Sequence, residues 1–200
     1  MSSRRPRTPP IRGGRLLGAL LLAFATPLAA APAIPPASAP SEYAVKAGFL
    51  YNFAKFVEWP QAAFDRLRAP LALCVFGADP FGGELDLAVR RKTAQGRPVV
   101  VRRLAGLGEL APCHVLFVGS AERERFAEVL DAVAGQSVLT VGEDDDFARA
   151  GGMISFVVRG TRVRFSIDVG ATERAGLKLS SRLLDLAELK VGAADGRKRR

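Results

Sequence analysis

The chain has 200 residues, of which 48% are hydrophobic and 24% are charged, and its formal net charge at pH 7 is +9. This length and apolar content suit one globular domain and exclude a disordered chain. The excess charge lies at the two ends, with five arginines within residues 1–15 and four basic residues at 197–200. The 20 basic residues between these ends balance the 20 acidic residues, so we expect no nucleic-acid partner.

Residues 1–31 have the order of a secretory signal peptide: arginines come first, then an apolar stretch, then small residues. The apolar stretch is short for a membrane span and contains Pro27, so we expect export with cleavage rather than an uncleaved anchor. Residues 32–40 are rich in Pro and Ala and are expected to form a linker. We therefore expect a periplasmic protein with one folded domain at 41–190 and a basic, disordered tail at 191–200.

The first predicted element of the domain is a helix from Ser41, a suitable N-cap, to Trp59, which Pro60 follows. Apolar residues at spacings of three and four give this helix one stripe that we expect to face the core. The stripe consists of Val45, Phe49, Phe53, Phe56 and Val57.

The opposite face of this helix carries small residues beside a tyrosine and a lysine. Small side chains would let a partner or a second subunit approach closely, whereas an ordinary solvated face is the alternative. The residues of this face are Ala44, Ala47, Gly48, Tyr51, Lys55 and Glu58. Among them, Tyr51 and Lys55 are candidate partner-binding residues.

From residue 71 onward, apolar segments alternate with helical segments. The predicted strands are 71–77, 98–104, 114–119 and 137–141, and the predicted helices are 82–91, 120–133 and 144–150. This alternation is typical of an α/β domain with a mostly parallel sheet and helices packed on it.

The end of the domain has a different pattern. Residues 153–158 and 162–169 flank Gly160-Thr161, a two-residue loop with glycine first that is typical of a type II′ hairpin turn. Apolar and polar residues alternate in the second arm, so one of its faces is expected to be buried. An amphipathic helix around 181–189 follows this C-terminal hairpin.

Three arginines of the hairpin, Arg159, Arg162 and Arg164, are expected on one face. They would suit an acidic partner or a phosphate group, so we treat them as candidate partner-binding residues. The alternative is a solvated basic strand.

Catalytic and metal-binding residues are scarce. The single histidine, His114, directly follows Cys113, and neighbours on a strand point to opposite faces, so the two do not suit a nucleophile–base pair. One His and two Cys cannot supply a tetrahedral zinc site, and the acidic run 143–146 lacks the spacing of a calcium loop. We interpret this run as the first turn of a helix and expect no metal, no cofactor and no enzymatic activity.

The two cysteines, Cys74 and Cys113, are expected to form a disulfide because exported proteins meet an oxidising environment. The bond would tie the first strand of the sheet to the start of the third. Two buried free thiols are the alternative.

Six segments spread over almost the whole domain carry a family resemblance: Ala44–Pro60, Leu73–Gly82, Cys113–Gly119, Ser137–Gly142, Gly151–Phe156 and Ala175–Ala187. Together they resemble the YfiR-like family of bacterial periplasmic proteins. The resemblance implies an α/β regulatory protein, able to dimerise, that represses an inner-membrane diguanylate cyclase alongside an outer-membrane lipoprotein. It also implies that Cys74 and Cys113 are a family disulfide pair, although the second pair of some relatives is missing.

Two functions follow from these observations. The first is a periplasmic regulator of a membrane-bound diguanylate cyclase or a related signalling enzyme. The second is a periplasmic protein that binds a small ligand, with Tyr51, Trp59 or the arginine strand lining its site.

Overall fold

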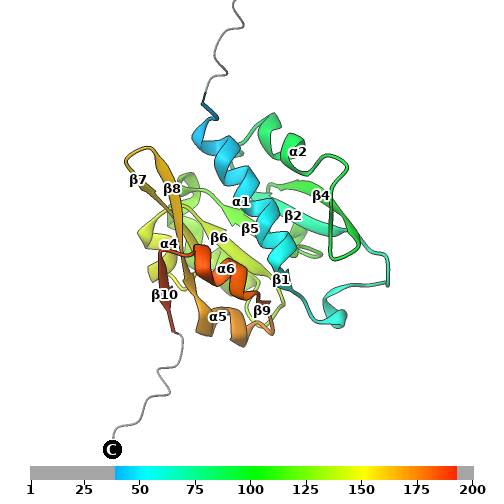
Figure 1. Ribbon diagram of the computed structural model, residues 1–200. Coiled ribbons are helices and arrows are strands. Elements are labelled where there is room, and N and C mark those ends of the chain that lie inside the picture. Colours follow the sequence, from blue (N-terminus) through cyan, green and yellow to red (C-terminus); the bar gives the residue numbers. More distant parts are fainter. Residues whose placement is uncertain (1–38, 193–200) are drawn as a thin grey trace, which may run out of the picture. The chain divides into compact units, whose positions relative to one another are not determined.

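The computed structural model describes residues 39–192, in which a mixed sheet of eight strands has helices on both faces (Figure 1). The strands of this sheet are β2 (Leu71–Phe76), β3 (Thr93–Ala94), β4 (Arg97–Leu104), β5 (Val115–Val118), β6 (Leu139–Gly142), β7 (Ile154–Arg159), β8 (Arg162–Asp168) and β10 (Leu189–Val191). The predicted signal peptide and nearly all of the predicted linker and tail lie outside the described residues.

The strands lie in the order β10, β8, β7, β6, β5, β2, β4, β3. The run from β7 to β4 is parallel, whereas β8 is antiparallel to β7, and β3 is antiparallel to β4. Every residue of β2 and β5 is buried, as expected for parallel strands covered on both faces. The predicted α/β fold with a mostly parallel sheet and a C-terminal hairpin is confirmed.

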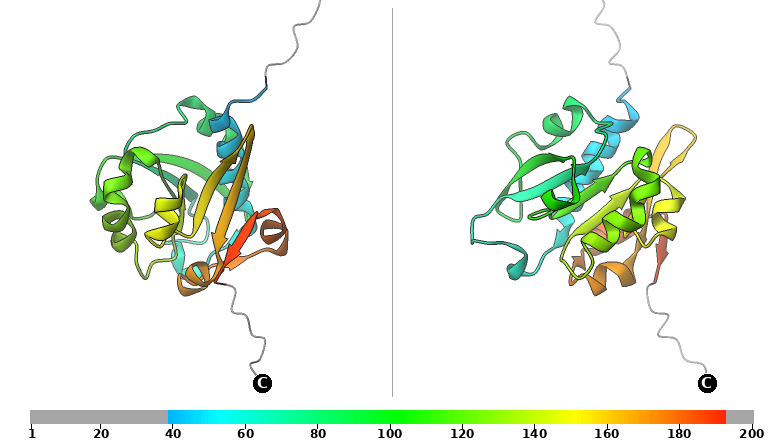
Figure 2. Two further views of the ribbon diagram at one scale, coloured as in Figure 1. Left: turned by 90° about the vertical axis from the view of Figure 1, so that its left-hand side faces the viewer. Right: turned by 180° about the vertical axis from the view of Figure 1, so that it is seen from behind.

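Helices cover both faces of the sheet (Figure 2). One face packs against α1 (Glu42–Phe56), α2 (Gly83–Val89) and α6 (Ser181–Leu186), and the other against α3 (Phe126–Ala132) and α4 (Asp145–Arg149). The remaining helices are α5 (Val169–Arg174) and the short 3-10 helices η1 (Gln61–Ala63), η2 (Leu107–Glu109) and η3 (Ser120–Arg125). Within residues 39–192, no helix has both the length and the apolar character to cross a membrane.

The core on the α1 side is centred on Phe53. Its ring lies 5.0 Å from Phe165 and 5.8 Å from Phe156, two residues paired across β7 and β8. Burying one such ring contributes about 2–3 kcal/mol, so this contact anchors α1 to the hairpin. Phe53 and Val57 are buried as predicted, and Val45, Phe49 and Phe56 are half-buried.

The predicted outward face of α1 is wrong at Ala47, which is fully buried. The contact face of the helix is wider than a single stripe because α2 packs along α1 and contributes Leu85 and Val89 to the same core. Among the other residues predicted to face outward, Lys55 and Glu58 are exposed, and Tyr51 is half-buried.

The predicted disulfide between Cys74 and Cys113 is confirmed, with the two Cα atoms 5.9 Å apart. Cys74 lies in the middle of β2 and Cys113 lies two residues before β5. Both are buried on the α3 side of the sheet, so the bond links two neighbouring strands beneath that helix.

Several element boundaries differ from those predicted. The first helix ends at Phe56 because β1 (Val57–Glu58) pairs with β9 (Lys178–Leu179) in a small antiparallel sheet. Val169 begins α5 instead of ending a strand, since the Asp168 carboxylate accepts a hydrogen bond from the Ala171 amide and caps that helix. The hairpin turn is as predicted, with a φ of 59° at Gly160.

Candidate functional site

In a fold of this kind, a ligand site is expected at the carboxyl edge of the parallel strands. In open α/β sheets, ligands bind outside the strand ends where the strand order reverses, which here lies between β2 and β5. Glycines directly follow β2 and β5 at Gly77 and Gly119, and β6 ends on Gly142, so no Cβ atom stands in the way of a close neighbour at these three strand ends.

The side chain of Glu122 fills the reversal point. A Cβ atom on Gly77 would lie 2.0 Å from the Glu122 Oε1 atom, so only glycine leaves room for this carboxylate. The carboxylate accepts a hydrogen bond of 3.3 Å from the Ala78 amide and pairs with Arg125 at 3.5 Å. The position that a ligand phosphate takes in many α/β proteins is thus taken by the chain's own acid.

Glu143, directly after β6, fills the neighbouring position. Its carboxylate accepts hydrogen bonds from the Ser120 amide at 2.9 Å, from Lys46 Nζ at 2.8 Å and from Tyr43 Oη at 3.2 Å. The side chains of Lys46 and Glu143 are only 3% and 6% exposed. These contacts fasten α1 to the end of β6.

Lys46 and Glu143 stabilise each other in their charged forms. Burial alone would raise the pKa of Glu143, but hydrogen bonds from Lys46 and Ser120 outweigh burial and hold the pKa below its ordinary value. Burial lowers the pKa of Lys46, and its hydrogen bonds to Glu143 and Glu42 outweigh that effect and raise the pKa. Both groups therefore stay charged at neutral pH, which suits a structural ion pair rather than proton transfer.

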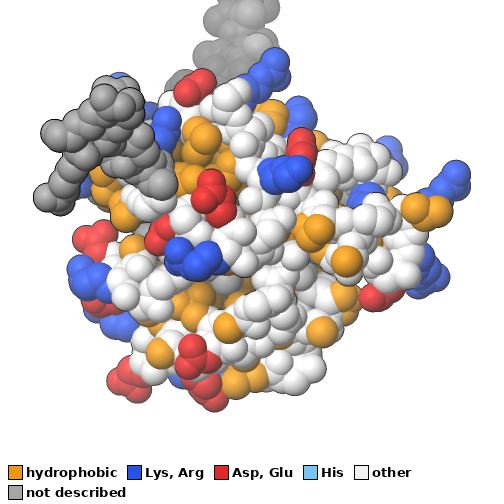
Figure 3. All heavy atoms as spheres, turned by 90° about the horizontal axis from the view of Figure 1, so that it is seen from below, with side chains coloured by type: hydrophobic (Ala, Val, Ile, Leu, Met, Phe, Trp, Pro, Cys, Tyr) orange, Lys and Arg blue, Asp and Glu red, His pale blue; other side chains and the backbone are white. Residues whose placement is uncertain are grey.

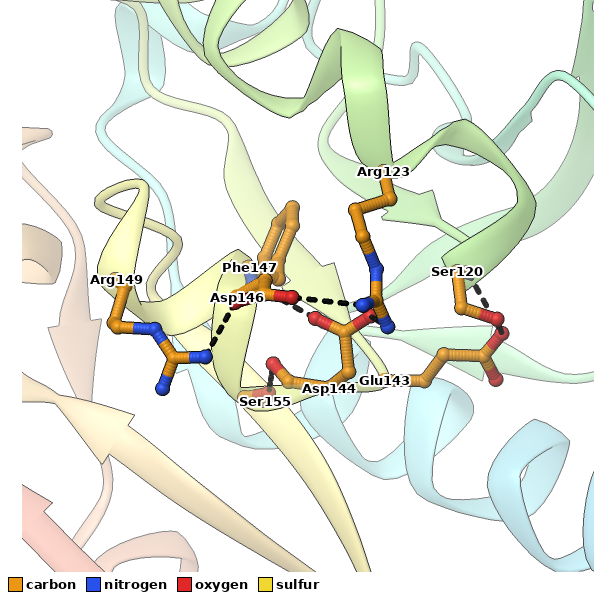
Figure 4. Close-up of polar contacts among 8 residues, drawn as sticks. All are labelled: Ser120, Arg123, Glu143, Asp144, Asp146, Phe147, Arg149 and Ser155. Atoms are coloured by element: carbon orange, nitrogen blue, oxygen red, sulfur yellow. Dashed lines mark hydrogen bonds and ion pairs between the residues drawn. The ribbon is translucent and has the colours of Figure 1, made fainter.

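Asp144 and Asp146 of the acidic run also contact protein groups (Figure 4). Asp144 caps α4 by accepting from the Phe147 amide at 2.9 Å and pairs with Arg123 at 2.9 Å. Asp146 pairs with Arg123 and Arg149, and the hydrogen bond from Arg149 holds the pKa of Asp146 low. The interpretation of the run as the first turn of a helix holds for Asp145 and Asp146, with Asp144 as the N-cap, but it is wrong for Glu143, which lies before the helix and pairs with Lys46. Residues 39–192 contain no cluster of His, Cys, Asp and Glu that could hold a metal.

The three hairpin arginines do lie on one face, as the alternation predicts. Arg159 is directly opposite Arg162 across the two strands, and Arg164 is two residues further along β8. The hairpin extends beyond the helices that cover the rest of the sheet (Figures 1 and 2). Within the described part of the chain, the counter-ion of these arginines is Glu188, 3.6 Å from Arg159, whose side chain is 69% exposed.

Tyr51 and Lys55 are not close to the arginines. Tyr51 Oη donates to the Thr93 carbonyl at 3.1 Å, and Lys92 Nζ lies 4.6 Å from its ring centre, so Tyr51 belongs to the β3 end of the sheet. Lys55 is exposed nearby on α1. The hairpin forms part of the other end of the sheet, and the structure does not join these candidates into one surface.

Trp59 does not share a site with either group. It is 7% exposed and its ring packs edge-on against His114, 6.2 Å between centres. The three features proposed to line a small-ligand site are therefore separate in the fold.

Sequence reasoning missed Lys46, Glu122 and Glu143. Lys46 lies beside an apolar stripe and the two glutamates lie among other charged residues, so neither periodicity nor composition distinguishes them. The glycines at the carboxyl ends of β2, β5 and β6 are the signal that could have pointed to this edge.

The surface shows no large region of one charge on the face drawn in Figure 3, where charged side chains of both signs surround hydrophobic patches. The exposed apolar residues of the chain include Leu186, Leu189 and Val191, all near the β8 edge of the sheet. The balance of charges gives this face no strong general affinity for polyanions.

Comparison with known proteins gives one family. No curated protein matches the chain at a significant level. The YfiR/HmsC-like family matches residues 43–188, a span that runs from the start of α1 to the residue before β10. Because this match covers most of the chain and its whole folded core, the chain belongs to the YfiR/HmsC-like family.

Proposed function

We propose that this protein is a periplasmic regulator that holds an inner-membrane diguanylate cyclase inactive through protein–protein contact. The observation that carries this proposal is the family match over residues 43–188. The family is regulatory rather than catalytic, and its members act in the periplasm with membrane signalling proteins. An outer-membrane lipoprotein and a second copy of the chain are further partners that the resemblance suggests.

The filled carboxyl edge supports a contact role. Glu122 and Glu143 take the positions at which α/β enzymes bind their substrates, and both are held there by hydrogen bonds. The exposed charged groups that we consider for partner binding lie on the hairpin instead, at Arg159, Arg162 and Arg164.

We assign the binding of the cyclase to the three hairpin arginines. Like charges directly opposite each other on two strands destabilise a hairpin by a few tenths of a kcal/mol up to about 1 kcal/mol, yet Arg159 and Arg162 are such a pair. Residues that work against local stability are concentrated at functional sites. An acidic surface on the partner would relieve this repulsion, so the arginines favour binding to an acidic partner.

The proposal is tested in the native organism. Deleting the gene is expected to raise cellular cyclic-di-GMP, and the wild-type chain is expected to restore the low level. The variant Arg162→Glu/Arg164→Glu should fail to restore it, whereas Arg68→Glu, an exposed charge reversal outside the sheet, should restore it fully. An unchanged cyclic-di-GMP level in the deletion strain would refute the proposal.

A further inference from the structure

We propose that the free edge of β8 is a strand-docking site for an extended segment of the membrane enzyme in which acidic and apolar residues alternate. This inference rests on the proposed function and specifies how the partner is recognised. It concerns residues 162–164, the part of β8 nearest the hairpin turn.

The outer edge of β8 is only partly covered. β10 pairs with Ser166, Ile167 and Asp168. The Glu188 amide donates to the Phe165 carbonyl at 2.9 Å, and no strand of the described residues pairs with this edge at 162–164. In Figures 1 and 2 the turn end of the hairpin extends past β10 with no other element at its outer side.

The backbone of Val163 faces this open edge. In a hairpin with a two-residue loop, the pair that flanks the loop, here Arg159 and Arg162, exchanges hydrogen bonds between the two strands. The N–H and C=O groups of Val163 then point away from β7, as those of Phe165 do. An incoming strand would find a donor and an acceptor at Val163 ready for pairing.

The two faces of the edge differ in chemistry. Arg162 and Arg164 project to one face, and Val163 projects to the other, beside Val158. On the face of Val163 a hollow of about 170 Å³ lies between the hairpin and the start of α1, lined by Val45, Val158 and Val163 and also by Glu42 and Thr161. Because side chains of a strand alternate between faces, a strand docked here would place acids against the arginines and apolar residues over this hollow.

Glu188 shows the same mode of binding within the chain. Its amide donates to the Phe165 carbonyl at the β8 edge, while its carboxylate reaches Arg159 at 3.6 Å. One residue thus combines main-chain pairing with an acid–arginine contact. The partner segment would continue this pattern along the uncovered part of the strand.

The test uses the purified exported chain and a fluorescent peptide of alternating Glu and Val residues. We expect a rise in fluorescence anisotropy on binding, and slower hydrogen exchange of the Val163 amide. Arg162→Glu/Arg164→Glu should weaken binding by at least about tenfold because it reverses the charge that the acids meet. Arg68→Glu and a peptide of alternating Lys and Val serve as matched controls.

A second variant separates strand pairing from charge alone. Val163→Pro removes the amide at the open edge, and proline is tolerated there because that amide takes no part in the β7–β8 ladder. It should abolish the binding while both arginines remain. Circular dichroism and the melting temperature report whether each variant is folded.

The docking site would be overturned by no binding of the Glu–Val peptide, by binding that Val163→Pro leaves unchanged, or by a dimer in sedimentation experiments that Val163→Pro dissociates. Binding of phosphatidylglycerol vesicles that survives Val163→Pro would assign the arginines to a lipid surface instead.

If Val163→Pro abolishes peptide binding but still restores low cyclic-di-GMP, the docking site is wrong and the proposed function stands. If deletion leaves cyclic-di-GMP unchanged, the proposed function fails whatever the peptide does.

Discussion

His114 is buried and neutral, and its two hydrogen bonds determine which ring nitrogen carries the proton. Its Nδ1 atom accepts a hydrogen bond of 3.2 Å from the Ala72 amide, so the proton is on Nε2, which donates to the Ala63 carbonyl at 3.1 Å. The ring stacks on Phe64 at 4.4 Å. The histidine therefore joins the end of η1 and Phe64 to the start of β2.

Burial lowers the pKa of His114 below its ordinary value of 6.5; nearby Arg97 acts in the same direction, and the Ala63 carbonyl and Asp65 oppose it. Unfolding therefore takes up a proton between the folded and unfolded pKa values, and the free energy of unfolding falls as the pH drops below 6.5. We expect urea denaturation to show this fall between about pH 7.5 and pH 5. His114→Gln, which cannot titrate, should show a smaller fall; an equal fall in both proteins would contradict the assignment.

The buried pair of Lys46 and Glu143 gives a second prediction. Lys46→Met leaves Glu143 buried without its cation, so the free energy of unfolding should drop by about 3 kcal/mol. The double variant Lys46→Met/Glu143→Gln should be less destabilised than the two single changes added together. Lys55→Met, on the exposed side of the same helix, is the control, and equal effects at both lysines would show that the pair contributes nothing.

At the scale of elements, continuous apolar runs predicted β2 and β5, and shorter apolar stretches or alternation predicted β4, β6, β7 and β8. β1, β3, β9 and β10 have only two or three residues, too few for any periodicity, and they form because tertiary neighbours offer backbone partners. The common face of the arginines followed from alternation alone. The burial of Ala47 did not, because it depends on where α2 packs.

The disulfide links β2 covalently to the segment before β5, and its removal should lower the free energy of unfolding by a calculable amount. Cys74 and Cys113 are 39 residues apart, and closing a loop of this length stabilises the folded chain by about 4 kcal/mol in the chain-entropy account. Cys74→Ala/Cys113→Ala should lower the free energy of unfolding by about this amount. Alkylation before reduction, followed by mass measurement, should label neither thiol of the wild type, and two labelled thiols would disprove the bond.

At the scale of the whole molecule, the basic character of the sequence is a property of its ends. The domain between them balances its charges, so its contacts depend on local groups such as the hairpin arginines rather than on a general positive field. Nucleic acids or polyanionic matrices should therefore bind the exported form weakly.

The predicted signal peptide leads to a prediction about the length of the exported protein. We expect the periplasmic fraction to contain a shortened form that begins within residues 30–34, after cleavage that follows the apolar stretch. Intact-mass measurement of protein from that fraction identifies the new first residue. A full-length mass, or recovery only with the membranes, would show an uncleaved anchor.

The family match ends at Glu188, one residue before β10 begins. A gene fragment cut at that boundary would keep every family feature yet lack the strand that covers Ser166–Asp168. Such a fragment would leave Ser166–Asp168 unpaired as well as 162–164, with only the Glu188 amide still bonded to the edge at Phe165, and an unpaired edge of this kind is where edge-to-edge aggregation starts. The few residues beyond the family boundary are thus expected to limit aggregation of the fold through this edge.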